Sequence, residues 1–259
     1  MNNFLKLAEP HLIFLIIIFL VVSYKIVISL LKATKNNTFD EVVKKATKNP
    51  GGYSDETIIS SVFKEWWTFI ISPVEENLAK SRINPNFLTF MSFTISFLTC
   101  YLYAADWIFL GSLVLLAGSS FDILDGRVAR INNVTSTKGA FLDSCLDRFS
   151  EIVVMFGLLI KFSSGAFVYV VFLATVFSLT VSYVKSAADN HGFDSNIGLM
   201  QRPERVVCLG LGGLISGCLE FYDVQILGIN HSILMFTIVF IAVLSLIATL
   251  QRFFKAMKN

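Results

Sequence analysis

The chain has 259 residues, of which 54% are hydrophobic, and its mean hydropathy is +0.67. This composition is too apolar for an ordinary soluble domain, and the length allows several membrane-spanning helices. The net charge of +2 says little about partners, and no nucleic-acid partner is expected. The sequence therefore predicts an integral membrane protein.

Seven apolar segments are candidate membrane-spanning helices. The first has a long apolar run, a weakly basic amino-terminal flank and no small-residue cleavage site after it, so we interpret it as a retained anchor rather than a signal peptide. The segments cover residues 11–31, 87–103, 107–121, 140–160, 166–184, 206–221 and 233–250.

A polar region, residues 34–82, separates the first span from the others. It begins as a linker in which the string NPGG at 49–52 is a strong turn signal. Residues 55–71 mix apolar and charged side chains, which predicts an amphipathic helix in the membrane interface; packing of that helix against the bundle is the alternative. The string SPVE at 72–75 has the order of a capping serine, a first-turn proline and a reciprocating glutamate, which predicts a short juxtamembrane helix.

These elements predict an all-α protein in three regions. Residues 1–33 form an N-terminal transmembrane anchor, residues 34–82 a cytoplasmic linker with interfacial and juxtamembrane helices, and residues 83–259 a six-span domain. Asn84 and Pro85 have the pattern of a cap and first-turn pair that opens the first helix of this domain.

The distribution of basic residues predicts the orientation in the membrane. Lysines and arginines gather in the polar region, in the loop between the fifth and sixth spans, and at the C-terminus, whereas the alternate loops contain few. Because basic loops stay on the cytoplasmic side, seven spans place the N-terminus outside and the C-terminus inside. We expect a multi-pass protein of the cell (inner) membrane.

Four aspartates lie beside or inside apolar runs, where an ionised carboxylate is costly and a function is the default explanation. Asp122 and Asp125 are three residues apart and Asp143 and Asp147 are four apart, so each pair shares one helix face. Divalent cations would relieve the repulsion among four converging carboxylates. Oxygen-only ligands favour Mg²⁺, Mn²⁺ or Ca²⁺ over a soft metal.

Small and basic residues around the aspartates favour phosphoryl-transfer chemistry. Gly126 lets a phosphate or sugar approach the backbone, and Gly139 lets two helices pack closely. Arg130 offers a planar cationic fork for a phosphate. Alternatively, the carboxylates pair in a structural network, for which the nearby partners would be Arg127, Arg130 and Arg148.

Read as one string, Asp122-x-x-Asp125-Gly126-x-x-Ala129-Arg130, eight residues, then Gly139-x-x-x-Asp143-x-x-x-Asp147, the chain resembles the CDP-alcohol phosphotransferase family at every signature position. The resemblance implies a six-helix bundle, transfer of a phosphatidyl group from CDP-diacylglycerol to an alcohol with release of CMP, and a homodimer. It also implies two divalent ions, Mg²⁺ or Mn²⁺, bridged by the four aspartates, with Asp147 acting as general base as well. The residues implied to contact the CDP-lipid are Asn86, Thr89, Gly126, Arg130 and Ser136, and for Asn86 and Ser136 a helix cap and an ordinary loop hydroxyl are the alternatives.

Basic residues at the start of the sixth span suggest a phosphorylated acceptor. Lys185 ends one span, and Arg202 and Arg205 stand at a helix N-terminus, which itself favours anions. Snorkelling positive-inside residues are the alternative. This stretch resembles bacterial phosphatidylinositol phosphate synthases, but Ala187 stands where that subfamily usually has another basic residue. Inositol phosphate is the favoured acceptor, and glycerol 3-phosphate is the alternative.

Two hypotheses of other classes remain. A cation transporter also uses intramembrane carboxylates, but it predicts charges distributed along a pathway rather than gathered at one end. An inactive scaffold descended from the family would have no reason to keep all four aspartates.

Overall fold

The computed structural model describes residues 84–132, 134–193, 200–222 and 231–258. All of them belong to one compact unit, Ile71–Asn259. The predicted N-terminal anchor, the polar linker, the interfacial helix and the juxtamembrane helix lie outside the described residues.

The described residues form six helices, one for each span predicted after the first. They are α4 (Pro85–Ala104), α5 (Ile108–Ile131), α6 (Thr137–Lys161), α7 (Phe167–Asn190), α8 (Arg202–Phe221) and α9 (Ser232–Ala256). The all-α prediction is therefore confirmed for this part of the chain. Most helices continue past their apolar runs, and α5 does so furthest, because it carries its polar residues on to Ile131.

Local capping explains where the helices begin. The Asn84 side chain accepts from the backbone N–H of Asn86 at 3.0 Å, and Pro85 occupies the first turn of α4, as predicted. The Ser136 hydroxyl accepts from the backbone N–H of Gly139 at 3.0 Å and starts α6. At the start of α8 the Glu204 carboxylate reaches back to the Gln201 backbone N–H at 2.9 Å.

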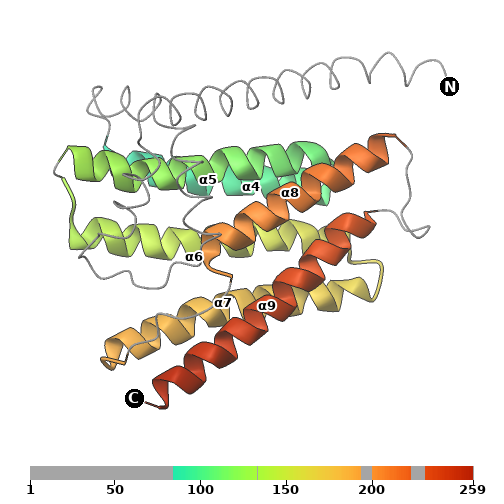
Figure 1. Ribbon diagram of the computed structural model, residues 1–259. Coiled ribbons are helices and arrows are strands. Elements are labelled where there is room, and N and C mark those ends of the chain that lie inside the picture. Colours follow the sequence, from blue (N-terminus) through green and yellow to red (C-terminus); the bar gives the residue numbers. More distant parts are fainter. Residues whose placement is uncertain (1–83, 133, 194–199, 223–230, 259) are drawn as a thin grey trace, which may run out of the picture. The chain divides into compact units, whose positions relative to one another are not determined.

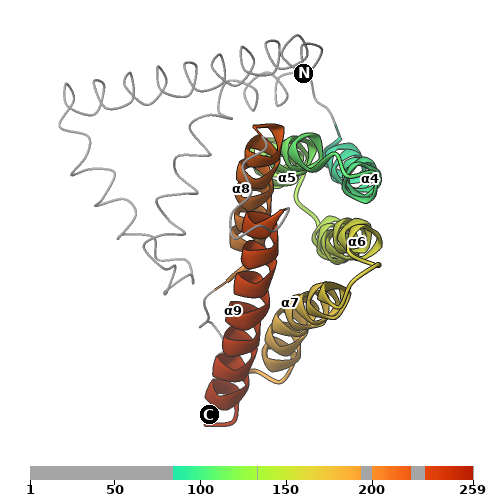
Figure 2. The ribbon, with the colours of Figure 1, turned by 90° about the vertical axis from the view of Figure 1, so that its right-hand side faces the viewer.

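The six helices form a ring in which each packs on two neighbours. The order around the ring is α4, α5, α8, α9, α7, α6 and back to α4. Figure 1 shows α4 and α5 together, with α8 crossing from them toward α9, and Figure 2 shows α4, α6 and α7 in succession along one side. This closure leaves a common interior that all six helices can line.

Close packing of the ring depends on small residues. A side chain at Gly157 of α6 would collide with the backbone of Cys100 in α4, and one at Gly217 of α8 would collide with the backbone of Phe109 in α5. In membranes, such glycines let helix backbones approach each other closely. These two glycines let α6 pack closely on α4 and α8 pack closely on α5.

Four of the described helices, α4, α5, α7 and α9, are long and apolar enough to cross a membrane by length and composition. The other two, α6 and α8, carry more charged residues, including Asp143 and Asp147 on α6 and Arg202 and Arg205 on α8. These four charges lie at one end of the bundle. The remaining length of α6 and of α8 is mainly apolar and packs against the neighbouring helices of the ring.

A set of charged residues joins three loops at the other end of the bundle; we call Asp106, Lys161, Glu220 and His231 the opposite-end cluster. Asp106 forms an ion pair with Lys161, and its carboxylate lies 3.1 Å from His231 Nε2. His231 Nδ1 lies 3.5 Å from the Glu220 carboxylate. The cluster thus links the ends of α4, α6, α8 and α9.

Candidate active site

The four aspartates meet where the C-terminal part of α5 faces the N-terminal part of α6. Asp122, Asp143 and Asp147 each place a carboxylate oxygen within 4.8 Å of the others. Asp125 faces the neighbouring helix instead: it is 3% exposed and accepts the Thr89 hydroxyl of α4 at 2.5 Å. Three of the four aspartates thus converge as predicted, whereas Asp125 is bonded to Thr89 and is not among the three grouped oxygens.

Arg202 enters this acidic group from the first turn of α8. Its Nη1 donates to Asp122 Oδ2 at 2.5 Å and lies 2.7 Å from Asp147 Oδ1. The second contact lacks hydrogen-bond geometry, so Asp147 Oδ1 is buried without a hydrogen-bond partner among the described residues. One guanidinium therefore contacts two carboxylates.

These features fit a divalent cation. The donor set consists of carboxylate oxygens from two helices, which is the chemistry of hard metal sites. Asp147 Oδ1 is in ion-pair contact with Arg202 but has no hydrogen bond of its own, so the arginine satisfies this buried oxygen only in part. The group of Asp122, Asp143 and Asp147 keeps an excess of negative charge after Arg202 is counted, so a further cation is electrostatically favoured.

A cavity of about 850 Å³ opens beside the aspartates. Asp125 and Asp143 form part of its wall, so the acidic group and the cavity are one site. A side chain at Gly126 would meet only the Arg130 guanidinium, at 3.6 Å, and the backbone at Gly126 is otherwise open. All five residues implied to contact the CDP-lipid line this cavity: Asn86, Thr89, Gly126, Arg130 and Ser136.

Several of these residues also have structural partners. Thr89 bonds to the Pro85 carbonyl as well as to Asp125, and Ser136 is the cap of α6. Ser136, for which the alternative was an ordinary loop hydroxyl, is instead a helix cap that also lines the cavity. For Asn86 the cap is its neighbour Asn84, so the side chain of Asn86 is left facing the cavity.

The three residues predicted to bind the acceptor phosphate are not grouped at one place with their charges available to a ligand. Arg205 is 3% exposed and forms a two-point pair with Glu151, at 2.7 and 2.9 Å, and it also donates to the Met200 carbonyl at 2.9 Å. Arg202 lies among the aspartates, as described above. Lys185 is half-buried on α7 and lines neither cavity described here.

Glu151 is a site-proximal residue that the sequence analysis missed. It lies one turn beyond Asp147 on α6, within an apolar run, which is the same signal that identified the aspartates. The residue was detectable as an intramembrane carboxylate, but its partner, 54 positions away, was not.

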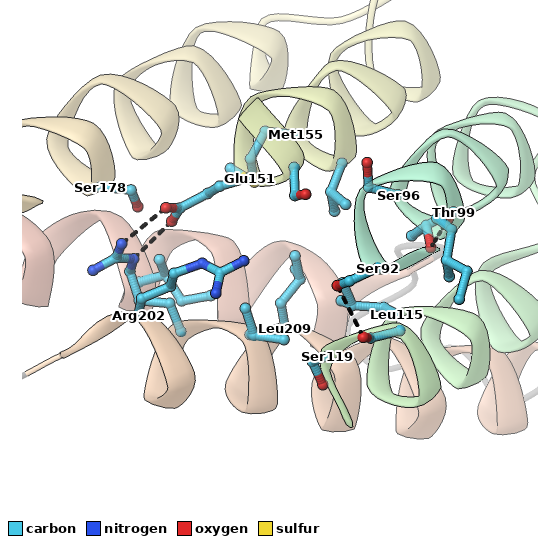
Figure 3. Close-up of a pocket in the computed structure, with 17 residues that line it drawn as sticks. Ser92, Ser96, Thr99, Leu115, Ser119, Glu151, Met155, Ser178, Arg202 and Leu209 are labelled. Atoms are coloured by element: carbon cyan, nitrogen blue, oxygen red, sulfur yellow. Dashed lines mark hydrogen bonds and ion pairs between the residues drawn. The ribbon is translucent and has the colours of Figure 1, made fainter. Parts of the chain in front are cut away.

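A second, smaller cavity of about 50 Å³ lies at the centre of the ring, next to Arg202 (Figure 3). All six helices contribute to its wall, and many of the contributed side chains are hydroxyls. Representative lining residues are Ser92, Ser119, Ser150, Ser178, Arg202 and Ile241. The wall of this cavity is mostly apolar, with hydroxyls and the Arg202 side chain at a few points, and its volume suffices for a few polar atoms or water molecules.

The structural-network alternative predicted partners on α5 and α6. Within the described residues, the ion pairs of Asp122 and Asp147 are made with Arg202 of α8 instead. Arg148 donates to the Ser144 carbonyl. The four aspartates gather at one end of the ring, which is not the distribution along a path that a transporter predicts.

An all-helical, multi-pass bundle with a carboxylate-rich site and an adjoining polar cavity defines the class: an α-helical membrane protein built around an acidic site. The sequence profile of the CDP-alcohol phosphatidyltransferases matches residues 82–257, which is more than half of the chain. The chain belongs to that family of enzymes, as the resemblance of its signature indicated.

Proteins similar to this chain include an archaetidylinositol phosphate synthase and a phosphatidylinositol phosphate synthase. The archaetidylinositol phosphate synthase of Pyrococcus horikoshii is 31% identical over 189 residues, covering 72% of this chain and 90% of that protein. The crystal structure of Mycobacterium tuberculosis phosphatidylinositol phosphate synthase with CDP-DAG bound has a TM-score of 0.62 and 27% identity, covering 72% of this chain and 93% of that one. The same enzyme in complex with manganese and citrate has a TM-score of 0.63 and 27% identity, covering 71% and 88%.

Proposed function

We propose that this enzyme transfers the phosphatidyl group of CDP-diacylglycerol to a phosphorylated alcohol, with release of CMP, and that inositol phosphate is the acceptor. The observation that carries the proposal is the junction of the four aspartates with the 850 Å³ cavity. Two relatives support it: one is named archaetidylinositol phosphate synthase and the other phosphatidylinositol phosphate synthase. The structure of the second has CDP-DAG bound.

The donor is proposed to bind in the large cavity. Its volume lies within the range of small-molecule sites. Arg130 supplies the cationic fork for the diphosphate, and the open backbone at Gly126 allows a close approach. Thr89, Asn86 and Ser136 then present polar groups from two other helix starts.

Two divalent cations, Mg²⁺ or Mn²⁺, are proposed to bind to Asp122, Asp125, Asp143 and Asp147. Two such ions can stabilise the attacking and leaving oxygens of an in-line displacement. The aspartates fix the site from two helices, and Thr89 holds Asp125 in position. A structure of a relative with manganese supports the choice of a hard metal.

Asp147 is proposed to accept the proton of the acceptor hydroxyl. The hydroxyl oxygen attacks the phosphorus that bears the diacylglycerol, a new P–O bond forms, and the P–O bond to CMP breaks. CMP carries away the bonding electron pair, so neither ATP nor a redox partner is needed. Asp147 suits this role because its carboxylate lies with those of Asp122 and Asp143, beside the proposed ions.

The acceptor phosphate is proposed to meet Lys185, Arg202 and Arg205, with glycerol 3-phosphate as the rival acceptor. Arg202 carries most of this argument because it touches Asp147, the proposed base. We also propose a homodimer in the inner membrane with the site facing the cytoplasm, and the three regions 1–33, 34–82 and 83–259 as anchor, linker and catalytic domain.

The test is CMP release by the full-length protein with CDP-diacylglycerol and Mg²⁺, with each of four acceptors in turn. They are inositol 1-phosphate, glycerol 3-phosphate, serine and inositol. Stimulation by inositol 1-phosphate, with the matching phospholipid product identified by mass, is the expected result. Stimulation by glycerol 3-phosphate alone would replace the acceptor, and no CMP release with a folded sample would overturn the proposed reaction.

A further inference from the structure

Arg202 occupies the coordination positions of the proposed metal site. Its guanidinium contacts the carboxylate oxygens of Asp122 and Asp147 at 2.5 and 2.7 Å, and these two aspartates belong to the set whose oxygens could hold an ion. The side chains of all three residues are at most 20% exposed, so solvent screens this contact only in part. An ion bound to the same oxygens and a guanidinium at these distances exclude one another.

The backbone of Arg202 is fixed, so only its side chain can leave. Pro203 follows it in the first turn of α8, and Glu204 bonds back to the Gln201 backbone. Arg205 anchors the same turn through its buried two-point pair with Glu151. Displacement of Arg202 therefore means a change of its side-chain torsions on a rigid helix start.

The small central cavity offers the displaced guanidinium a new place. Ser92 and Ser119 donate their hydroxyl protons to the carbonyls of Gly118 and Leu116, at 3.0 and 2.8 Å, which leaves their oxygen lone pairs as acceptors. The Glu151 carboxylate lines the same cavity. Arg202 already borders it, as Figure 3 shows, and its Nε is buried with no hydrogen-bond partner within the described residues.

We propose that Arg202 is an exchangeable counterion of the metal site: it neutralises Asp122 and Asp147 until a divalent cation displaces it. The inference rests on the proposed function for the metal site and adds a control of metal loading. Because the arginine must be displaced, it weakens the apparent affinity for the ion. The displaced guanidinium rests at the small central cavity until an acceptor phosphate binds it in place of the aspartates, so metal binding and acceptor binding favour one another.

The experiment is a Mn²⁺ titration of the full-length protein by calorimetry, without substrates, in wild type and variants. We expect Arg202→Gln to bind Mn²⁺ roughly tenfold more tightly or better, since the ion no longer has to displace the charged contacts to Asp122 and Asp147. Arg148→Gln is the matched control, because it removes the same charge one residue from Asp147 without a contact to Asp122 or Asp147 in the described structure. It should change the affinity much less.

One further variant separates the outcomes. Asp143→Asn should weaken Mn²⁺ binding; if wild-type binding does not depend on Asp143, the metal site fails and this inference with it. If binding depends on Asp143 but Arg202→Gln binds no more tightly than wild type or Arg148→Gln, the exchange is wrong while the proposed function stands. Folding of Arg202→Gln is checked by its melting temperature, which we expect to be lowered in EDTA and restored toward wild type by Mn²⁺.

Discussion

At the α5–α6 end of the bundle three aspartates lie near one arginine that contacts two of them, whereas in the opposite-end cluster two carboxylates are in contact with a lysine or a histidine. Three of the opposite-end residues, Asp106, Glu220 and His231, also have metal-ligand chemistry, but Lys161 already supplies a cation there. The first end adjoins a cavity of about 850 Å³. The balance of charge therefore distinguishes a site that recruits a cation from a cluster that joins loops.

The largest expected effect is the difference in CMP release between an Asp→Asn substitution at the acidic end and one in the opposite-end cluster. Asp147→Asn should lower CMP release by about 100-fold or more, because it removes both a proposed general base and a metal ligand. Asp106→Asn should keep close to the wild-type rate. Both are measured at saturating substrate, with folding checked by gel filtration, and a substantial rate in Asp147→Asn would remove that residue from the base role.

The buried ion pair of Arg205 and Glu151 should contribute strongly to the free energy of unfolding. Arg205→Met leaves the Glu151 carboxylate uncompensated at 9% exposure, which costs about 3–5 kcal/mol. The double variant with Glu151→Leu should recover most of that loss, as measured by melting temperature. If the acceptor KM stays raised in the recovered double variant, Arg205 also binds the acceptor; if single and double variants melt alike, the pair does not stabilise the bundle.

The smallest effect is expected from the opposite-end cluster. His231→Gln removes contacts to two carboxylates that are nearly half exposed, so it should cost about 1 kcal/mol or less. CMP release and Mn²⁺ affinity should not change. A large loss of either would mean that the two ends of the bundle are coupled, and that the comparison of their charges does not separate their roles.

The sequence predicted those features that depend on local composition. The six spans follow from apolar length, and the four aspartates stand out because charge is costly among apolar residues. The spacing of Asp122 and Asp125 implied a helix beyond the apolar run, but the end of α5 at Ile131 was not predicted, since its polar turns bond to Thr89 of α4 and Arg202 of α8. The partners of Arg202 and Arg205 were missed for a related reason: they lie 80 and 54 positions away, and only the closed ring brings them together.

The central proposal is that the acidic end activates a CDP-linked lipid with a divalent cation. Its most direct test is CMP release from CDP-diacylglycerol with inositol 1-phosphate, measured on the full-length protein with Mg²⁺ or Mn²⁺ and again after chelation with EDTA. We predict release that requires both the cation and the acceptor and that returns when the metal is restored. Release that continues unchanged in EDTA would contradict the claim.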